Sequence, residues 1–189
     1  MKCERCEDQA TLHITDACNH AVSAEAHLCE PCAHKYLSEV HTPALDTRWS
    51  GPHNEHREYQ IEVVRIIISE LDDQQVIVFR EVGGTRAFPL MCGIFEASII
   101  DRKLKNLPSP RPLTHDGWFA TLTVLGAKLE SVGIDALEDS IYFASLRLAR
   151  RSSIEPVRVD IRPSDAVAMA LTARVPIYIS EQLLLEAIE

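Results

Sequence analysis

The sequence predicts an α+β protein, in which a mixed or antiparallel β-sheet domain with packed helices is preceded by a small zinc-binding hairpin module. Two Cys-x-x-Cys pairs stand near the N-terminus, where each pair can hold a metal ion from one tight turn. Further along, β-branched runs bounded by turn residues are interspersed with segments of helical spacing. That irregular order favours hairpins over the strict strand–helix alternation of a doubly wound sheet.

The first predicted element is a hairpin that brings the two cysteine pairs together. Residues 11–15 alternate polar and apolar side chains, and residues 26–28 can run back beside them as the second arm. One cysteine pair precedes the first arm and the other follows the second arm, so both meet at the ends of the hairpin. With a short helical stretch at residues 33–37, this module is predicted to occupy residues 1–40.

The metal typical of this spacing is structural Zn²⁺ held by the thiolates of Cys3, Cys6, Cys29 and Cys32. A closed site of this kind folds a module and hydrolyses nothing, and zinc contributes roughly 10–16 kcal/mol to such small folds. The module also contains competing ligands, namely His13, His20, His27, His34 and Cys18. Since His27 and His34 flank the second pair, a site of three thiolates and one imidazole stays open.

Residues 41–60 are predicted to form a linker, because turn formers and polar residues replace any apolar periodicity there. The larger domain then occupies residues 61–189. It opens with β-branched strands at residues 61–68 and 75–80, which form a hairpin, and continues with a third strand at residues 86–91.

Helices and further strands follow in this domain. A helix is predicted over residues 95–104, where apolar side chains recur at helical spacing. After a proline-rich loop, Thr114 is placed to cap a second helix, whose apolar face carries Trp118, Phe119, Leu122 and Leu125. The remaining elements are strands at residues 128–134, 141–148 and 156–161, a helix at 163–173, a strand at 176–179 and a helix at 181–188.

Composition favours a soluble folded protein. With 46% hydrophobic residues among 189, the chain can bury a core of ordinary size. The first residues are polar and no apolar run approaches the roughly 18 residues that span a bilayer, so we expect no membrane partner and a cytoplasmic location. Thiols stay reduced there, which agrees with metal-bound cysteines. The remaining two, Cys18 and Cys92, are expected to be buried or half-buried thiols.

The net charge of -9 argues against a protein that coats nucleic acid by bulk electrostatics. It leaves room for a local basic patch, and basic residues do cluster at Arg102, Lys103 and Lys105 and again at Arg147, Arg150, Arg151 and Arg158. Each cluster is either a solvated surface or a track for phosphates, and the residues alone leave both open.

Two loop-to-helix junctions gather polar side chains that suit phosphate chemistry. The first holds Arg111, Thr114, His115 and Asp116, and the second holds Arg162, Ser164 and Asp165. Unpaired N–H groups at helix starts attract anions, and an adjacent arginine completes a phosphate-binding corner. The same hydroxyls and carboxylates also serve as ordinary helix caps, paired with arginine for structural reasons.

These junctions carry a resemblance to a known family. Residues from about 61 to 189 resemble the bifunctional nuclease domain family, whose members cleave RNA and DNA, through residues 93–97, 111–116, 143–144, 160–166 and 176–178. The first 37 residues are similar to the zinc-binding N-terminal module of the activator of bacterial protein-arginine kinases, through the cysteine pairs and residues 10–15 and 27–33.

The resemblance implies phosphodiester hydrolysis of a nucleic acid partner, RNA or DNA. Such a reaction needs a group that activates water, a cation against the phosphate charge and commonly a divalent ion held by carboxylates. We assign His115 as base or ligand. The carboxylates that would hold Mg²⁺ or Mn²⁺ are those of Glu96, Asp116 and Asp165. The residues that would contact phosphate are Arg111, Thr114, Arg162 and Ser164.

A second hypothesis makes the chain a non-enzymatic regulatory adaptor, whose zinc module recognises a protein partner while the larger domain binds a ligand or dimerises. The acidic charge favours it, whereas the clustered Arg, His and Asp positions favour the nuclease. A homo-oligomer stays open in either case, because apolar strands such as residues 66–68 can pair across a sheet edge. The two hypotheses differ in whether Glu96, His115, Asp116, Arg162 and Asp165 meet in one cleft.

Overall fold

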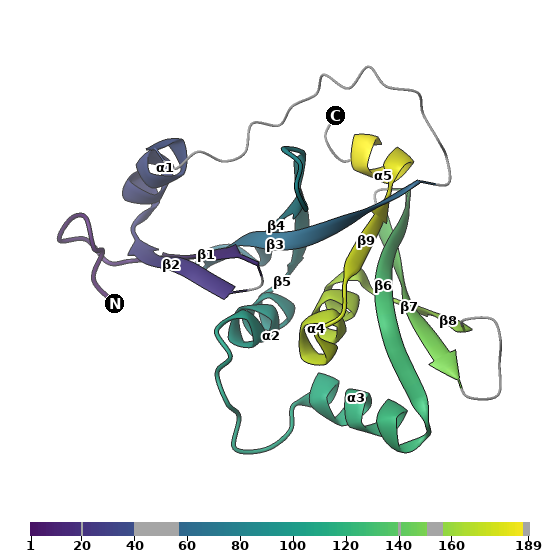
Figure 1. The fold of residues 1–189 in the computed structure, drawn as a ribbon. Helices are drawn as coiled ribbons and strands as arrows, with labels where there is room; N and C mark the ends of the chain where they lie inside the picture. The colour runs from purple at the N-terminus through teal and green to yellow at the C-terminus, as the bar shows by residue number, and fades with distance from the viewer. Residues whose placement is uncertain (20, 40–56, 140, 151–156, 187–189) are drawn as a thin grey trace.

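The nine strands described in this protein form one sheet, organised around the long strand β3 (Glu58–Ser69). This computed structural model describes residues 1–19, 21–39, 57–139, 141–150 and 157–186, and five helices accompany the sheet within them (Figure 1). The predicted α+β class is therefore confirmed. None of the described helices is long and apolar enough to cross a lipid bilayer.

The elements follow the predicted order. The other strands are β1 (Leu12–Cys18), β2 (Ala21–Leu28), β4 (Gln74–Glu81), β5 (Ala87–Gly93), β6 (Ala127–Glu138), β7 (Ile141–Arg150), β8 (Val157–Ile161) and β9 (Ile177–Ser180). The helices are α1 (Glu30–Glu39), α2 (Ile94–Leu104), α3 (Thr114–Val124), α4 (Pro163–Ala173) and α5 (Glu181–Glu186).

The sheet order is β2-β1-β3-β9-β6-β7-β8, with β4 and then β5 added on the other edge of β3. Strands β6 and β9 pair in parallel, and the other pairs are antiparallel. The first residues of β3 pair with β9 and its last residues pair with β1, so these two strands share one edge of β3. The short strand β9 thus joins the two halves of the sheet.

The β-branched run of β3 occupies the interior of the sheet. Ile66 pairs with Thr15 of β1 on one side and with Ile77 of β4 on the other. The expectation that residues 66–68 pair across a sheet edge is therefore wrong, because both sides of this stretch are already hydrogen-bonded. Neighbouring side chains of a strand point to opposite faces. Accordingly, Ile66 joins the main core and Ile67 joins a smaller core beneath α1.

The predicted linker at residues 41–60 lies mostly outside the described residues, and β3 already begins at Glu58. The hairpin of β1 and β2 continues the sheet of the larger domain through its pairing with β3. The division into a module at residues 1–40 and a domain at residues 61–189 remains a prediction.

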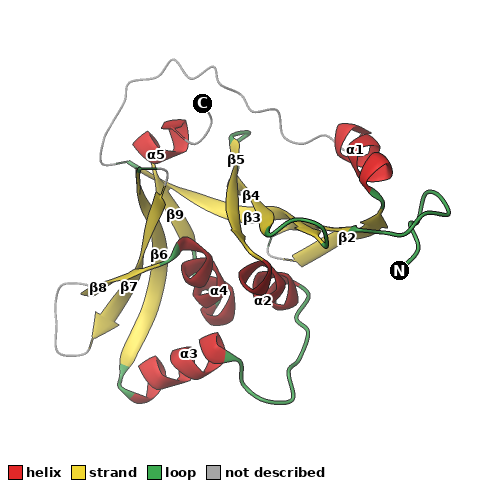
Figure 2. Cartoon of the chain, turned by 180° about the vertical axis from the view of Figure 1, so that it is seen from behind, coloured by secondary structure: helices red, strands yellow, loops and turns green. Residues whose placement is uncertain are grey.

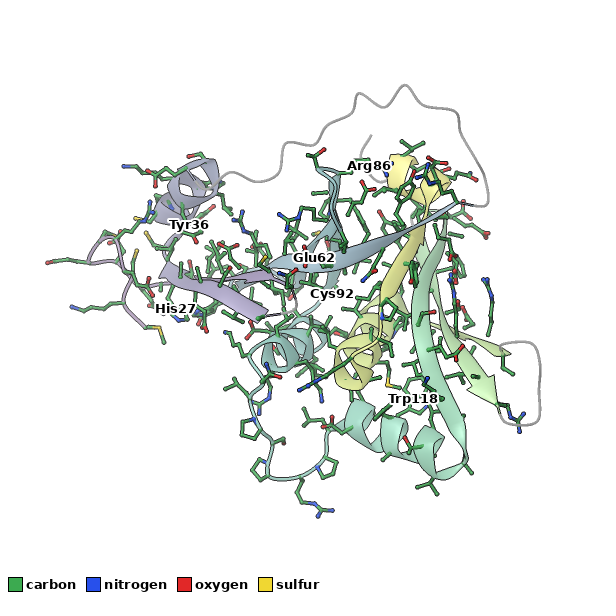
Figure 3. All side chains as sticks on the ribbon, viewed as in Figure 1. His27, Tyr36, Glu62, Arg86, Cys92 and Trp118 are labelled. Atoms are coloured by element: carbon green, nitrogen blue, oxygen red, sulfur yellow. The ribbon has the colours of Figure 1, made fainter. Side chains whose placement is uncertain are left out.

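The main core lies between the sheet and helices α2 and α4, which pack side by side (Figure 2). Helix α4 is rich in alanine, and small side chains let a helix approach its neighbours closely on several sides. Residues 166–170 are all buried for this reason. Trp118 of α3, labelled in Figure 3, also packs against the main core.

Three local expectations are wrong. Thr114 does not cap α3: Leu113 is the N-cap residue, and its backbone N–H donates to the Asp116 carboxylate. Leu125 follows the end of α3 and is 76% exposed instead of lying on the apolar face. Cys18, at the far end of β1, is exposed, whereas Cys92 is half-buried as expected.

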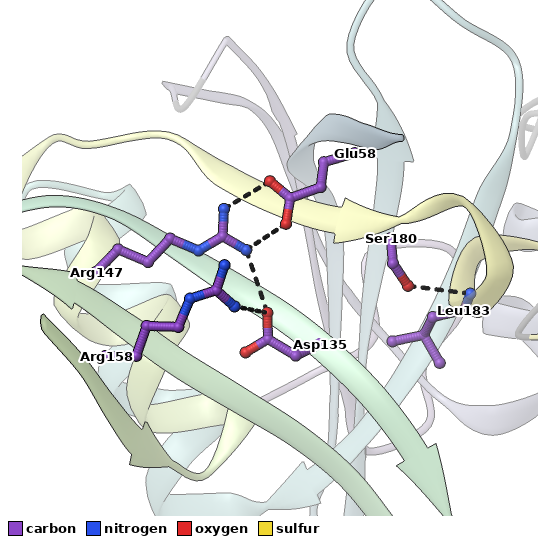
Figure 4. Close-up of polar contacts among 6 residues, drawn as sticks. All are labelled: Glu58, Asp135, Arg147, Arg158, Ser180 and Leu183. Atoms are coloured by element: carbon purple, nitrogen blue, oxygen red, sulfur yellow. Dashed lines mark hydrogen bonds and ion pairs between the residues drawn. The ribbon is translucent and has the colours of Figure 1, made fainter. Parts of the chain in front are cut away.

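Arg147 of β7 fastens the two halves of the sheet beside β9 (Figure 4). Its guanidinium donates to both carboxylate oxygens of Glu58 on β3, at 2.6 and 2.5 Å, and to Asp135 on β6 at 3.2 Å. Gly133 of β6 makes this crossing feasible, because a Cβ atom there would collide with the Arg147 guanidinium and the Asp135 carboxylate. The bond to Glu58, the largest influence, raises the pKa of Arg147.

Candidate functional site

The four paired cysteines gather at the open end of the β1–β2 hairpin. One ligand atom of each, from Cys3, Cys6, Cys29 and Cys32, lies within 4.8 Å of all the others. Within this group, Cys6 Sγ and Cys29 Sγ are 3.4 Å apart. Sulfurs around a tetrahedral Zn²⁺ at about 2.3 Å lie about 3.8 Å from one another. This cluster, which we call the cysteine cluster, can therefore hold a metal ion such as zinc.

Local structure explains why these sulfurs meet. The hairpin register pairs His13 with His27, which aligns the two strand ends that lead to the cysteines. The Cys3 N–H donates to the Asp8 carbonyl at 2.9 Å and closes the first turn. Helix α1 starts at Glu30 and carries Cys32 in its first turn. The bond to Cys29 is the main influence that raises the pKa of the Cys32 thiol. A bound cation would offset the repulsion between neighbouring thiolates and so favour their ionised form.

The competing histidines are engaged elsewhere or face solvent. His13 Nδ1 and His27 Nδ1 lie 2.6 Å apart, and His13 Nε2 lies 2.9 Å from Glu70 Oε1. His34 is exposed on α1, and His20 lies outside the described residues. Among the described residues, the four thiols form the one group of three or more His, Cys, Asp or Glu ligands that lie within 4.8 Å of one another.

The hairpin is held on the larger domain by polar contacts as well as by strand pairing. Asp16 of β1 binds Arg65 of β3 at 2.5 Å and accepts a hydrogen bond from Tyr36 of α1 at 2.8 Å. Thr15 donates to Asp101 of α2 at 2.7 Å. The hairpin therefore contacts α2, whose first turn carries Glu96, one of the predicted site residues.

The second site lies where α2 and α4 begin. A pocket of about 490 Å³ separates these helix starts from β5 and β7, and it is lined by Pro89, Leu90, Met91, Cys92, Gly93, Glu96, Ile141, Tyr142, Arg162, Pro163 and Ser164. Three of the predicted site residues, Glu96, Arg162 and Ser164, thus share one pocket. Cys92, labelled in Figure 3, belongs to the end of β5 that leads into α2.

A chain of charged contacts begins at this pocket, with Glu96 and Arg162, and joins three helices. The Arg162 guanidinium lies 3.0 Å from Glu96 Oε1 in the first turn of α2 and donates to Asp165 Oδ2 in the first turn of α4 at 2.7 Å. The other oxygen of Asp165 lies 3.0 Å from His115 Nε2 of α3. We call Glu96, His115, Arg162 and Asp165 the helix-start site. Burial, the largest influence, works against ionisation of Asp165, but the bonds to Arg162 and His115 outweigh it and lower the pKa of this carboxyl.

His115 has an unusual position within this site. His115 is only 6% exposed, and its Nδ1 has no hydrogen-bond partner among the described residues. A neutral imidazole that donates from Nε2 keeps a lone pair on Nδ1. The Asp165 carboxylate is therefore placed to orient an imidazole that can accept a proton.

Asp116 faces a different neighbour. Its carboxylate binds the Lys103 ammonium of α2 and accepts the N–H of Leu113 at 3.0 Å. The bond to Lys103, the largest influence, lowers the pKa of Asp116. Arg111 and Thr114 are exposed at the start of α3. The structure thus joins four of the predicted residues in one chain of contacts and leaves Asp116, Arg111, Thr114 and Ser164 outside it, although Ser164 lines the adjoining pocket.

Some residues of the pocket were not predicted as site residues. Tyr142 and Cys92 line it, and burial raises the pKa of the Cys92 thiol to about 11. Gly93 precedes α2, and a Cβ atom there would lie 2.7 Å from Glu96 Oε2. The sequence could have indicated Gly93 as a site residue, because it directly precedes the predicted helix and stands three residues before Glu96. No sequence pattern indicated Tyr142, since β7 reaches the pocket only through the sheet.

Comparisons with known proteins place similar sequences in one family. The profile of a family described as bifunctional nuclease domain matches residues 77–189. Two proteins of Mycobacterium tuberculosis, one from strain CDC 1551 / Oshkosh and one from strain ATCC 25618 / H37Rv, are each 36% identical over 128 residues. Each match covers 68% of this chain and 75% of the relative, and both relatives are described as uncharacterized.

Proposed function

The chain belongs to the bifunctional nuclease domain family, and from this premise we propose that it hydrolyses phosphodiester bonds of RNA or DNA at the helix-start site. The observation that carries the proposal is the chain of contacts that joins Glu96, Arg162, Asp165 and His115 from three helices, beginning at a pocket that Glu96 and Arg162 line. Groups of these types supply what hydrolysis of a phosphodiester requires: a base, a cation and anionic ligands.

In this proposal His115 acts as the general base. Asp165 fixes the ring through Nε2, and Nδ1, which is buried and has no partner among the described residues, would take the proton of an attacking water once substrate binding opens a path to it. The ionised Asp165 carboxylate then stabilises the imidazolium that forms. Asp116 acts as a positioning residue, because its bonds to Leu113 and Lys103 fix the helical turn that carries His115.

Arg162 is the proposed phosphate-binding residue. Its side chain is 67% exposed although it contacts two carboxylates, so the guanidinium can reach a phosphate without unfolding the site. Ser164 lines the same pocket from the first turn of α4, where backbone N–H groups favour an anion. Arg111 and Thr114 are exposed at the start of α3 and would contact the nucleic acid strand on either side of the cleaved bond.

Glu96 and Asp165 are the residues that would hold a divalent ion, with the pocket leaving space for its water ligands. Two carboxylates and several waters suit Mg²⁺ or Mn²⁺. An ion there would offset negative charge on the phosphate. Arg162 now occupies the position between these carboxylates, so it would have to turn toward the substrate when the ion binds.

The cysteine cluster has a separate role in this proposal. Four thiolates leave no coordination position for substrate, so zinc there would fold the hairpin and leave hydrolysis to the helix-start site. The hairpin surface then serves as a docking site for a protein partner or for the nucleic acid. We place the chain in the cytoplasm, where the thiols remain reduced.

A cleavage assay tests the proposal. Labelled single-stranded RNA and DNA are incubated with purified protein and Mg²⁺ or Mn²⁺, and cleavage is followed on denaturing gels. His115→Ala should slow cleavage by about 10²–10⁴-fold, the usual contribution of a positioned base. Asp165→Asn and Glu96→Gln should also lower the rate and raise the metal concentration needed for half-maximal activity.

Glu130→Gln provides the matched control, because Glu130 is an exposed carboxylate on β6 away from the pocket lining. Its rate should equal that of the parent protein. Full activity of repurified His115→Ala would exclude this site. If the parent protein cleaves neither nucleic acid with either ion, the adaptor hypothesis replaces the nuclease.

A further inference from the structure

A second pocket lies at the opposite ends of the helices that form the helix-start site. It measures about 580 Å³ and is lined by Gln60, Lys103, Asn106, Ala170, Leu171, Arg174, Val175 and Pro176. Lys103 and Asn106 belong to the end of α2, and Arg174 ends α4. Pockets of roughly 300–1,000 Å³ are typical of sites for small organic ligands. We call it the helix-end pocket.

The charged groups that line the helix-end pocket are cationic. Lys103 and Arg174 contribute them, and no carboxylate belongs to the lining. The Lys103 charge is shared with Asp116, which binds its ammonium. Arg174 is exposed, and no ion pair joins it to another described residue. In a protein of net charge -9, a pocket with this lining is a local positive site.

The backbone fixes where Arg174 stands. This residue takes a left-handed conformation, with φ 56° and ψ 48°, and its N–H donates to the Ala170 carbonyl as the last bond of α4. Asn106, on the facing helix end, is also left-handed, with φ 51°. Left-handed conformations are uncommon for residues other than glycine. The side chains of Arg174 and Asn106 therefore both start from a left-handed turn that ends a helix, and both line the same pocket.

We propose that the helix-end pocket binds a phosphorylated small molecule of nucleotide size. The planar Arg174 guanidinium matches two oxygens of a phosphate, and the Lys103 ammonium adds a second cation. The side-chain amides of Gln60 and Asn106 offer both donors and acceptors to a polar body such as a sugar or base. Leu171, Val175 and Pro176 form an apolar wall against which the flat part of the ligand would pack.

This site is separate from the proposed catalytic one, yet the two are linked by contacts. Lys103 holds Asp116, and the preceding residue, His115, contacts Asp165. A phosphate that draws Lys103 away from Asp116 would loosen the first turn of α3. Binding itself requires no nuclease activity, so it can be measured whether or not the proposed function holds.

Calorimetric titration of the zinc-loaded full chain tests the proposal. The probes are adenosine 5′-monophosphate, adenosine and inorganic phosphate at low ionic strength. The monophosphate should bind at least tenfold more tightly than either of its parts. Arg174→Asn should weaken it by about tenfold or more, the loss expected when one charge-assisted phosphate contact is removed. Asparagine accepts the left-handed backbone readily, so this variant should fold.

Two arginine variants serve as matched controls. Arg150→Gln removes an equivalent exposed charge from the end of β7, and Arg162→Gln removes the phosphate-binding residue of the helix-start site. Both should bind the monophosphate within about twofold of the parent protein. The proposal is overturned if adenosine binds as tightly as its monophosphate, if Arg174→Asn has no effect, if Arg162→Gln abolishes binding, or if 10 mM monophosphate gives no heat and no NMR shift.

Discussion

The cysteine cluster and the helix-start site reach their geometry by opposite routes. All four thiols come from residues 3–32, and one hairpin and one helix start suffice to bring them together. The helix-start site draws on residues 96–165 and exists only when three helices pack against one sheet. The first site therefore depends on local chain geometry, whereas the second depends on the entire core. Substitutions in the two sites should therefore differ in how much of the protein they destabilise.

Loss of a cysteine ligand should have the largest effect, but one confined to the hairpin. Cys29→Ser should abolish stoichiometric zinc binding and unfold residues 1–39, because the small core beneath α1 includes Cys3 and Cys29 themselves. Zinc content and hydrogen exchange measure both. Cys18→Ser, which alters an exposed thiol of β1, should keep zinc and protection unchanged. Full zinc content in Cys29→Ser would disprove the four-thiolate assignment.

The next largest effect should come from the ion pair of Asp16 and Arg65, which joins the β1–β2 hairpin to β3. In Asp16→Asn, Arg65 loses its buried partner, and breaking one side of such a pair costs about 3–5 kcal/mol. Denaturant unfolding followed by circular dichroism measures the loss. Asp73→Asn, in the exposed turn between β3 and β4, is the control and should leave stability unchanged. A destabilisation below 1 kcal/mol would mean that strand pairing alone holds the hairpin.

A moderate and pH-dependent effect is expected at the helix-start site. Asp165→Asn should lower the free energy of unfolding at neutral pH by about 1–3 kcal/mol, because two charge-assisted bonds are weakened. The folded pKa of Asp165 lies below its ordinary value, so the carboxylate stabilises the parent protein above about pH 4. That advantage is lost as the pH falls through the folded pKa. The difference in unfolding free energy between parent and variant should therefore be smaller at pH 3 than at pH 7, as unfolding curves at the two pH values would show.

The smallest effect should follow the loss of a surface ion pair in the hairpin region. Arg5 and Glu39 lie 2.7 Å apart, but both side chains are largely exposed. Glu39→Gln should leave the thermal midpoint unchanged within the reproducibility of calorimetry, at low and at high salt. A clear drop at low salt would show that this pair fixes α1 over the cysteine cluster.

Much of the architecture could be predicted because its signals are local. The spacing of cysteines specified the cluster, and proline followed by serine and aspartate specified the start of α4 at Pro163. The helix starts also indicated where Glu96 and Asp165 would stand. Local signals suffice wherever a turn or a cap decides the geometry.

The remaining features depend on long-range packing, which spacing does not encode. His115 and Asp116 are neighbours in sequence, yet one contacts α4 and the other contacts α2, because successive residues of a helix face different directions. The pairing of β1 with β3 depends on which sheet edge is free, and the Arg147 contact depends on space left by Gly133. No pattern in the sequence indicates either of them.

The place of β9 has a consequence for how this chain is made. Strands β3 to β8 are synthesised before Ile177, so the sheet without β9 consists of two parts, each lacking a neighbour on the edge where β9 will lie. Domains complete their folding as units once the missing segment is available. The four residues of β9 are therefore needed before the two parts become one sheet. Without β9, each part exposes an edge of unpaired N–H and C=O groups, at which another chain can pair.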